Sequence, residues 1–267
     1  MTLFHIFLVA IIQGITEFLP ISSSGHLILL PKLTGMADQG LVIDVAVHVG
    51  TLFAVVLYFR SDVRIALAGL PRALTGRVDT PGARLALLLL IATVPVIVAG
   101  ALLKLSGHTE SLRSVAVIGW TSIIFGLVLY WSDRIGPHKK SIADWTVTDA
   151  IVTGLWQAIA LIPGTSRSGI TITGARILGY RRHEAARISM LMSIPTIVAS
   201  GVLLGAEAAM EPDPTVLAGA ATAAAFAFAA ALAALSLMMR FLDRVSFTPY
   251  VIYRVALGLV LLALAYG

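Results

Sequence analysis

Six long, almost uninterrupted apolar stretches dominate this sequence and decide what the chain can fold into. They cover residues 41–59, 85–103, 115–131, 188–206, 216–239 and 250–267. A helix that crosses the hydrocarbon core of a bilayer needs about 20 mostly apolar residues, at a rise of about 1.5 Å each. Each stretch is therefore predicted to be a transmembrane helix, and the chain is predicted to be an integral membrane protein.

The composition agrees and excludes several other classes of protein. Hydrophobic residues make up 58% of the 267 residues and charged residues only 12%. Soluble domains carry about 25% charged residues, so a disordered chain and an ordinary soluble enzyme are excluded. The sequence contains no cysteine, which excludes a disulfide scaffold and thiolate chemistry. The net charge of +5 does not indicate nucleic acid binding, because the Lys and Arg residues lie between apolar stretches.

Two further apolar regions, 1–31 and 149–178, are each interrupted by a small, polar run. The interruption covers residues 20–25 (PISSSG) in the first region and 163–169 (PGTSRSG) in the second. Proline removes a backbone donor and glycine loosens a helix, so both helices should break there. Broken backbone at membrane depth is tolerated only where protein or a watery cavity satisfies it. We expect two re-entrant helix–loop–helix hairpins; simple loops or kinked full spans are the alternative.

The predicted fold is therefore an all-α integral membrane protein with six transmembrane helices and two re-entrant hairpins. The basic residues test this layout, because cytoplasmic loops are enriched in Lys and Arg. We assign four connections to the cytoplasm: 60–84, 132–148, 179–187 and 240–249. Together they hold 13 of the 19 Lys and Arg residues. The opposite side has Lys32, Lys104 and Arg113, and an acidic loop with Glu207, Glu211 and Asp213. This enrichment of basic residues in the cytoplasm holds only if the chain leaves each hairpin on the side of the membrane from which it entered.

The two interrupted regions also resemble each other at a fixed offset of 144 residues. The identical pairs are Gln13 and Gln157, Ile15 and Ile159, Ser22 and Ser166, Ser24 and Ser168, and Gly25 and Gly169. We expect one membrane domain, 1–267, made of two repeats at about 1–132 and 149–267, with hairpins 1–31 and 149–178. Three spans separate the hairpins, so the second copy is inverted. In such architectures the site lies where the broken helices meet.

The residues of the hairpin tips predict a site for phosphate or diphosphate. A Gly/Ser-rich turn that opens onto a helix offers free N–H groups to an anion. Arg167 adds a planar, permanently charged fork that suits bidentate phosphate contact. The candidate phosphate-binding residues are Ser22, Ser24, Gly25, Thr165, Ser166, Ser168, Gly169 and Thr171.

The first hairpin is predicted to carry the groups that hydrolysis of a phosphate bond requires. Glu17 can hold a divalent metal or act as a base, and the hydroxyls of Ser22, Ser23 and Ser24 beside His26 offer a nucleophile with a proton acceptor. The alternatives are structural: membrane serines often only hydrogen-bond across a helix pair, and His26 can be a packing histidine. Asp44 and His48 lie four residues apart, on one helix face, where they either pair with each other or serve the site. For Arg254 we expect a structural role.

At this point the motifs resemble those of a known family. Residues 13–26 (QGITEFLPISSSGH) and 163–169 (PGTSRSG) resemble the two signatures of the undecaprenyl-diphosphate phosphatase family, of the BacA type. The likeness continues through 246–254 (SFTPYVIYR) and covers essentially the whole chain. The resemblance implies removal of the terminal phosphate of undecaprenyl diphosphate, which recycles the carrier lipid of peptidoglycan synthesis and confers bacitracin resistance. It also implies a bacterial inner-membrane protein with its active site facing the periplasm.

The resemblance assigns roles to individual residues. Glu17, Ser23, His26 and Arg167 would be the acidic residue, the nucleophile, its partner and the phosphate-binding arginine. The family uses a divalent cation such as Mg²⁺ or Ca²⁺, which we expect on Glu17. Position 13 is Glu in many relatives and Gln in this chain, so metal binding would lean on Glu17, on Asp44, on the carbonyl of Gln13 and on the substrate's phosphates.

Alternatives stay open at this stage. In one mechanism, Ser23 attacks phosphorus, and His26 takes the serine proton or gives a proton to the leaving oxygen. In a second, His26 activates water, and in a third, His26 is itself the nucleophile. A transporter or flippase of a lipid phosphate or other anion could use the same hairpins without any nucleophile. The small residues of 216–239 allow close helix packing, within one chain or in a homodimer.

Overall fold

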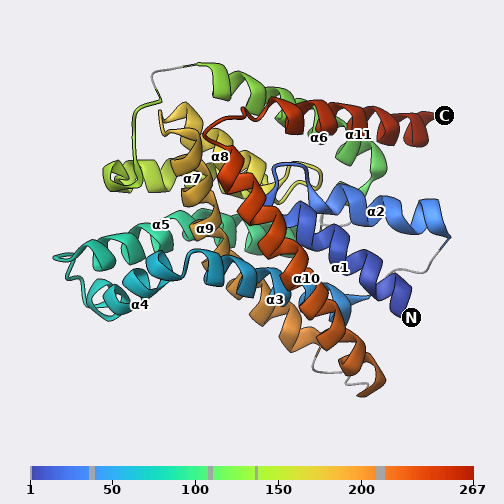
Figure 1. Ribbon diagram of the computed structural model, residues 1–267, viewed down its shortest axis with the longest axis horizontal. Helices are drawn as coiled ribbons and strands as arrows, with labels where there is room; N and C mark the ends of the chain where they lie inside the picture. The colour runs from blue at the N-terminus through green and yellow to red at the C-terminus, as the bar shows by residue number, and fades with distance from the viewer. Residues whose placement is uncertain (1, 36–39, 108–110, 136–137, 209–213) are drawn as a thin grey trace.

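The computed structural model is built from α-helices, as predicted (Figure 1). It describes residues 2–35, 40–107, 111–135, 138–208 and 214–267, and only the backbone of 32–34, 206–208 and 214–217. The helices are α1 (Leu3–Phe18), α2 (Ser23–Thr34), α3 (Leu41–Tyr58), α4 (Arg60–Leu74), α5 (Pro81–Ser106), α6 (Val115–Arg134), α7 (Val147–Ile159), α8 (Arg167–Ile177), α9 (Arg182–Ala208), α10 (Pro214–Phe241) and α11 (Thr248–Tyr266). Within these ranges the chain forms no strand, only a single bridge between Lys140 and Tyr180.

Six of the described helices are long and apolar enough to cross a membrane. They are α3, α5, α6, α9, α10 and α11, and their mean hydropathies lie between 1.8 and 2.7. Each coincides with one of the predicted stretches, with ends that differ by a few residues. The prediction of a multi-pass membrane protein is confirmed.

Helix α4 was not predicted, because its sequence alternates charged and apolar residues over only 15 positions. The segment was treated as a connection between spans. Its apolar residues follow a helical period, and Val63, Ala66 and Leu70 line an apolar cavity of about 280 Å³ together with residues of α5 and α9. The helix packs along α5, where Gly69 and Gly82 permit a very close approach of the two backbones. An amphipathic helix of this kind is stabilised by packing, which a search for long apolar runs does not detect.

Both predicted breaks are present. Helix α1 ends at Phe18 and α2 begins at Ser23, and the chain folds back between them (Figure 1). Helix α7 ends at Ile159, earlier than the polar run at 163–169 indicated, and α8 begins at Arg167. Two helix–turn–helix pairs are therefore present. Their entry into a membrane from one side or the other stays a prediction.

Residues paired by the offset of 144 have matching backbone conformations. Ser22 and Ser166 each precede a helix with a positive φ, 73° and 67°. Each donates to or accepts from the serine two positions later, with oxygen–oxygen distances of 3.1 Å for Ser22 and Ser24 and 3.2 Å for Ser166 and Ser168. A non-glycine residue with this φ is uncommon, so two at equivalent positions support the proposed repeat.

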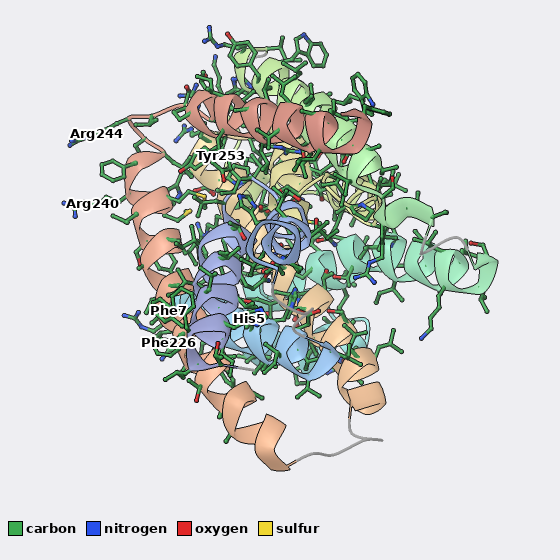
Figure 2. All side chains as sticks on the ribbon, turned by 90° about the vertical axis from the view of Figure 1, so that its right-hand side faces the viewer. His5, Phe7, Phe226, Arg240, Arg244 and Tyr253 are labelled. Carbon is green, nitrogen blue, oxygen red and sulfur yellow. The ribbon has the colours of Figure 1, made fainter. Side chains whose placement is uncertain are left out.

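Small residues of α10 receive α1 and α3 at close range. A Cβ on Gly14 of α1 would lie 2.7 Å from the carbonyl oxygen of Ala227, and one on Gly50 of α3 would lie 2.2 Å from that of Ala224. Figure 2 shows Phe7 of α1 beside Phe226 of α10, with ring centroids 5.0 Å apart in an edge-to-face contact. The small-residue face predicted in 216–239 thus packs within the chain. This packing positions α1, which carries Glu17.

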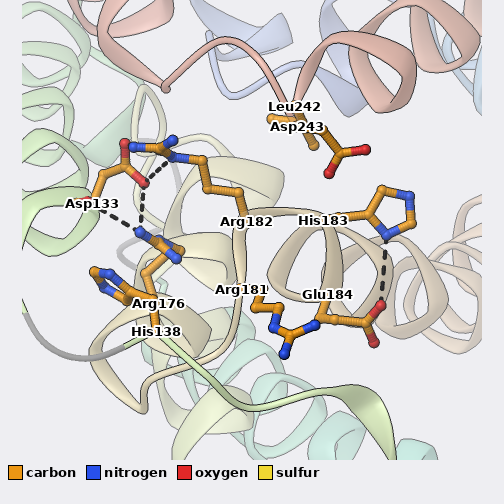
Figure 3. A pocket seen from close by; sticks show the side chains of 9 residues that line it. All are labelled: Asp133, His138, Arg176, Arg181, Arg182, His183, Glu184, Leu242 and Asp243. Carbon is orange, nitrogen blue, oxygen red and sulfur yellow. Dashed lines mark hydrogen bonds and ion pairs between the residues drawn. The ribbon is translucent and has the colours of Figure 1, made fainter.

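The ends of α6, α8 and α9 are joined by a charged network. The carboxylate of Asp133 forms ion pairs with Arg176 and Arg182, each at 2.9 Å, and the Asp133 and Arg176 side chains are almost fully buried. Both line a cavity of about 540 Å³ together with His138, where burial, reinforced by nearby Arg176, lowers the histidine's pKa (Figure 3). Removing Asp133 would leave the buried Arg176 without its compensating charge, so the network fixes these helix ends.

The charge distribution predicted from sequence can be followed only in part. Arg240 and Arg244 lie at the outer edge of the molecule, at and just beyond the end of α10 (Figure 2). Of the residues assigned to the opposite side, Glu211 and Asp213 lie outside the described residues, as do the side chains of Lys32 and Glu207.

The close packing of α3 on α10 makes a stability prediction. Gly50→Ala should lower the free energy of unfolding by about 1–3 kcal/mol, because the new methyl group meets backbone atoms that cannot move aside. Gly201→Ala in α9 is the matched control, since nothing lies within 4 Å of a Cβ there. Thermal unfolding in detergent should give a lower midpoint for Gly50→Ala alone. Equal midpoints for the two variants would contradict the packing described above.

Candidate active site

An ion pair joins the tips of the two helix–turn–helix pairs. Nη2 of Arg167, at the start of α8, donates to Oε1 of Glu17 in α1 at 2.9 Å. The exposed fractions of the two side chains are 14% and 8%, so the pair is largely withdrawn from solvent. Nη1 of Arg167 is also buried and has no hydrogen-bond partner in the structure. The arginine therefore keeps a donor for a further anion.

The second oxygen of Glu17 is surrounded by polar groups. Oε2 accepts from Nε2 of Gln13 at 2.7 Å and from Oγ of Ser23 at 3.3 Å, and it lies 3.9 Å from Nε2 of His48. The Ser23 hydroxyl thus faces a carboxylate that can accept its proton. The proximity of Glu17, Ser23 and Arg167, which was predicted from sequence, is present in the structure.

These groups line a cavity between the two tips. The cavity has a volume of about 330 Å³, and its polar lining comprises Thr16, Glu17, Ser22, Ser23, Ser24, His48, Ser166, Arg167, Thr196 and Ser200. A second cavity of about 700 Å³ shares Ser23, Ser24 and His48 and adds Gln13, Asp44 and Arg113. The volumes suit a phosphate-bearing headgroup.

The start of α2 offers backbone donors to this space. The first N–H groups of a helix have no partner within the helix, and the Ser22 side chain makes no hydrogen bond to cap them. At the start of α8 the hydroxyl of Ser166 does cap the N–H of Gly169, at 3.2 Å. The two tips are thus equivalent in backbone but differ in their free donors.

His26 has other partners than the predicted one. Nδ1 lies 2.7 Å from the carbonyl oxygen of Ser22, so it carries the proton, and Nε2 lies 2.6 Å from the hydroxyl of Tyr253 in α11. The two rings are also stacked, with centroids 5.6 Å apart. The described contacts do not bring His26 to Ser23, so a proton transfer between them stays a prediction. The sequence did not indicate a role for Tyr253, although the neighbouring Arg254 was a candidate.

Several predicted phosphate-binding residues support the tips instead of lining the cavity. Ser168 donates to the carbonyl oxygen of Leu19 at 2.9 Å, and Thr171 donates to that of Arg167 at 2.8 Å. Thr171 also contacts the hydroxyl of Ser189 at 2.5 Å, a contact the sequence did not indicate. Their phosphate contacts stay predictions.

The remaining candidates are Thr165, in the turn before α8, and Gly25 and Gly169, near the starts of α2 and α8. The hydroxyl of Thr165 is buried and without a partner. A Cβ on Gly25 would meet Ile118 and Leu257 at 3.6 Å, and one on Gly169 would lie 2.9 Å from Nη1 of Arg254. Gly169 therefore allows close packing behind its tip, whereas a Cβ on Gly25 would make only ordinary contacts.

The side chain of Arg254 binds backbone carbonyl groups of the second tip. The side chain is fully buried, and Nη2 donates to the carbonyl oxygens of Gly164 at 3.1 Å and Thr165 at 2.8 Å. Its Nε and Nη1 are buried without partners, and no described carboxylate pairs with it. Thr121 assists by donating to the carbonyl oxygen of Pro163 at 2.6 Å. The structural role expected for Arg254 is thus a grip on the loop that carries Arg167.

The residues present fit a divalent cation that takes part of its ligands from a substrate. No group of three Asp, Glu, His or Cys side chains among the described residues could hold an ion alone. Oε1 of Gln13 is buried without a partner beside Glu17. Mg²⁺ commonly binds one or two carboxylates plus phosphate oxygens, so Glu17 and Gln13 suit it. Asp44 lines the adjacent larger cavity with Gln13.

Comparison with known proteins agrees with the geometry. A family model described as "Bacitracin resistance protein BacA" matches residues 6–260. Proteins named undecaprenyl-diphosphatase from Ruegeria pomeroyi and Dinoroseobacter shibae are each 69% identical over 267 residues, which is 100% of both chains. A protein of that name from Hahella chejuensis is 47% identical over 100% of this chain and 99% of its own. The chain therefore belongs to the BacA family.

Proposed function

We propose that this chain hydrolyses undecaprenyl diphosphate to undecaprenyl phosphate and inorganic phosphate. One observation carries the proposal: Ser23, Glu17 and Arg167 line one cavity between the tips, and Nη1 of Arg167 is buried without a hydrogen-bond partner. A hydroxyl, a proton acceptor and a phosphate-binding cation are the parts that phosphoryl transfer to serine requires. The names of the relatives describe the same activity. It recycles the carrier lipid of cell-wall synthesis and fits the family's association with bacitracin resistance.

Binding would place the terminal phosphate between Arg167 and the first turn of α2. Nη1 of Arg167 and the free backbone N–H groups of Ser23 and Ser24 would donate to its oxygens. Because these donors are fixed before the substrate arrives, they stabilise the charge that develops at phosphorus without reorganisation.

The chemical step would use Ser23 as nucleophile and Glu17 as base. Oγ of Ser23 forms a bond to the terminal phosphorus, and the bond from that phosphorus to the bridging oxygen breaks, so the lipid monophosphate leaves. The proton of Ser23 passes to the carboxylate of Glu17, with which the Ser23 hydroxyl already forms a hydrogen bond of 3.3 Å. Water then cleaves the phosphoserine, and Glu17 returns the proton to Ser23. A role for His26 in protonating the leaving oxygen stays a prediction.

A divalent cation, Mg²⁺ or Ca²⁺, would be held by Glu17, with the carbonyl of Gln13 and the substrate's phosphates. When bound, it supplies charge neutralisation on the diphosphate. Asp44 is a further predicted oxygen ligand.

We place the protein in the bacterial inner membrane, with the hairpin tips open to the periplasmic side. The support is the concentration of Lys and Arg in the connections assigned to the cytoplasm.

A homodimer also stays a prediction. Because α1 and α3 already cover the small-residue face of α10, two copies would pair through another surface.

Arg167→Ala should reduce phosphate release from undecaprenyl diphosphate by about 10²- to 10³-fold, since it removes a cation that stabilises the transition state. The assay uses purified protein in detergent with Mg²⁺, and Arg240→Ala, at the exposed end of α10, should match the wild type. Equal release by all three proteins would keep the enzyme but refute this site. Absence of release by folded wild type would favour the transporter, which sealed vesicles would then test.

The nucleophile can be trapped. Acid quenching during turnover, followed by peptide mass spectrometry, should find the phosphate on Ser23, and Ser23→Ala should give neither the adduct nor turnover. Phosphate on His26 would make that residue the nucleophile. Full activity of Ser23→Ala would instead assign the attack to water.

Chelation tests the metal. Ethylenediaminetetraacetate should abolish phosphate release, because Glu17 and Gln13 offer few ligands and the ion takes the others from the substrate, so a chelator should remove it. Added Mg²⁺ should restore the activity. Undiminished release after exhaustive chelation would show that the arginine and the backbone donors suffice.

A further inference from the structure

His48 aims an unprotonated ring nitrogen at the carboxylate of the proposed site. Nδ1 lies 2.7 Å from the carbonyl oxygen of Asp44, an acceptor, so Nδ1 carries the proton and Nε2 of the neutral ring carries a lone pair. That nitrogen lies 3.9 Å from Oε2 of Glu17. A histidine that binds a metal usually donates its other N–H to a carbonyl or carboxylate in this way, which fixes the tautomer.

The amide nitrogen of Gln13 lies between these two acceptors. It is 2.7 Å from Oε2 of Glu17 and 3.2 Å from Nε2 of His48. Oε2 of Glu17 and the lone pair of His48 Nε2 are therefore both directed at the same point. In this structure the NH₂ group of Gln13 occupies that point. The other end of that amide, Oε1, is buried and has no hydrogen bond. Rotation of the amide would bring Oε1 toward the same point and leave all three atoms facing a cation.

The spacing suits a shared ion. Bonds from small divalent ions to carboxylate oxygen and imidazole nitrogen are about 2.0–2.2 Å long. Two such bonds span up to about 4.2 Å, more than the 3.9 Å that separates Oε2 of Glu17 from Nε2 of His48. Both atoms can reach one ion without movement of the helices.

We propose that His48 is a nitrogen ligand of the divalent cation, together with Glu17 and the carbonyl of Gln13. The proposal deepens the function proposed above, on which it rests. With Gln at position 13 this corner has one carboxylate, and the imidazole supplies the missing donor. Imidazole suits Fe²⁺, Ni²⁺ and Zn²⁺, whereas Mg²⁺ and Ca²⁺ favour oxygen ligands, so the site should bind such transition-metal ions more tightly than Mg²⁺ or Ca²⁺.

The other histidine near the tips is arranged differently. Nε2 of His26 is occupied by the hydroxyl of Tyr253 at 2.6 Å, and its ring stacks on that tyrosine. His26 thus serves as an internal control, because it lies in the hairpin that carries Glu17 but its Nε2 already contacts Tyr253.

Electron spin echo measurements on bound Mn²⁺ test the assignment without any turnover. Purified full-length protein in detergent, loaded with substoichiometric Mn²⁺ and no substrate, should show nuclear modulation from a directly bound ¹⁴N. Labelling all histidines with ¹⁵N should convert that modulation to ¹⁵N. His48→Gln should abolish it and weaken Mn²⁺ binding by about tenfold or more, and His26→Gln should change neither.

Each other outcome overturns the proposal. Mn²⁺ that binds without nitrogen modulation, modulation that survives in His48→Gln, or modulation lost in His26→Gln excludes His48 as the ligand, and so does a protein that binds no Mn²⁺. If His48→Gln does not fold, ¹⁵N-histidine labelling of wild type and His26→Gln still decides whether a histidine other than His26 holds the ion. Mg²⁺-dependent phosphate release is measured on the same samples, so the proposed function can stand while this inference fails.

Discussion

The ion pair between Glu17 and Arg167 is the interaction on which the arrangement of this molecule depends. The two residues are 150 positions apart and come from different helix–turn–helix pairs, yet their side chains meet at 2.9 Å. Because burying a charge is costly unless its partner is accurately placed, both tips have to be held rigidly. The hydrogen bonds of Ser168 to Leu19 and of Gly164 to Ser24 do this directly, since each links one tip to the other.

The supports behind the tips follow from the same demand. On the first side, α1 is fixed by its close packing on α10, where Gly14 leaves no room for a side chain. On the second side, Arg254 and Thr121 bind the carbonyl groups of the turn that precedes Arg167. Loops at membrane depth expose backbone carbonyls that lack water, so a buried arginine is an economical way to satisfy several at once. The geometry of the candidate site is thus set by residues that do not line the cavity.

The sequence was sufficient for those parts of the molecule that depend on local properties. Apolar length identified the six spans, and Pro20 and the Pro163-Gly164 pair identified the breaks, because both effects act within a few residues. The proximity of Glu17, Ser23 and Arg167 followed from the expectation that the two tips meet. Helix α4 was missed because its helical form depends on packing against α5.

Partners across the fold could not be predicted in this way. The hydroxyl that binds His26 comes from Tyr253, which is 227 positions away, and no pattern in either segment specifies that pairing. Likewise, Ser168 and Thr171 resemble phosphate ligands in sequence, whereas their hydroxyls bind protein atoms. A short polar motif specifies donors and acceptors, and the packing of distant helices decides where each one is directed.

The guanidinium of Arg254 has a consequence for which headgroups the site can retain. It is fully buried, no described carboxylate neutralises it, and it lies directly behind the loop that carries Arg167. Its field is weakly screened by the apolar surroundings, so the cavity has a fixed positive potential even while Arg167 is paired with Glu17. Such a potential attracts an anion in proportion to its charge, and a diphosphate has more charge than a monophosphate. At the site proposed above, the lipid product would therefore be held less tightly than the lipid that entered, and the charge of the resting protein would favour its departure.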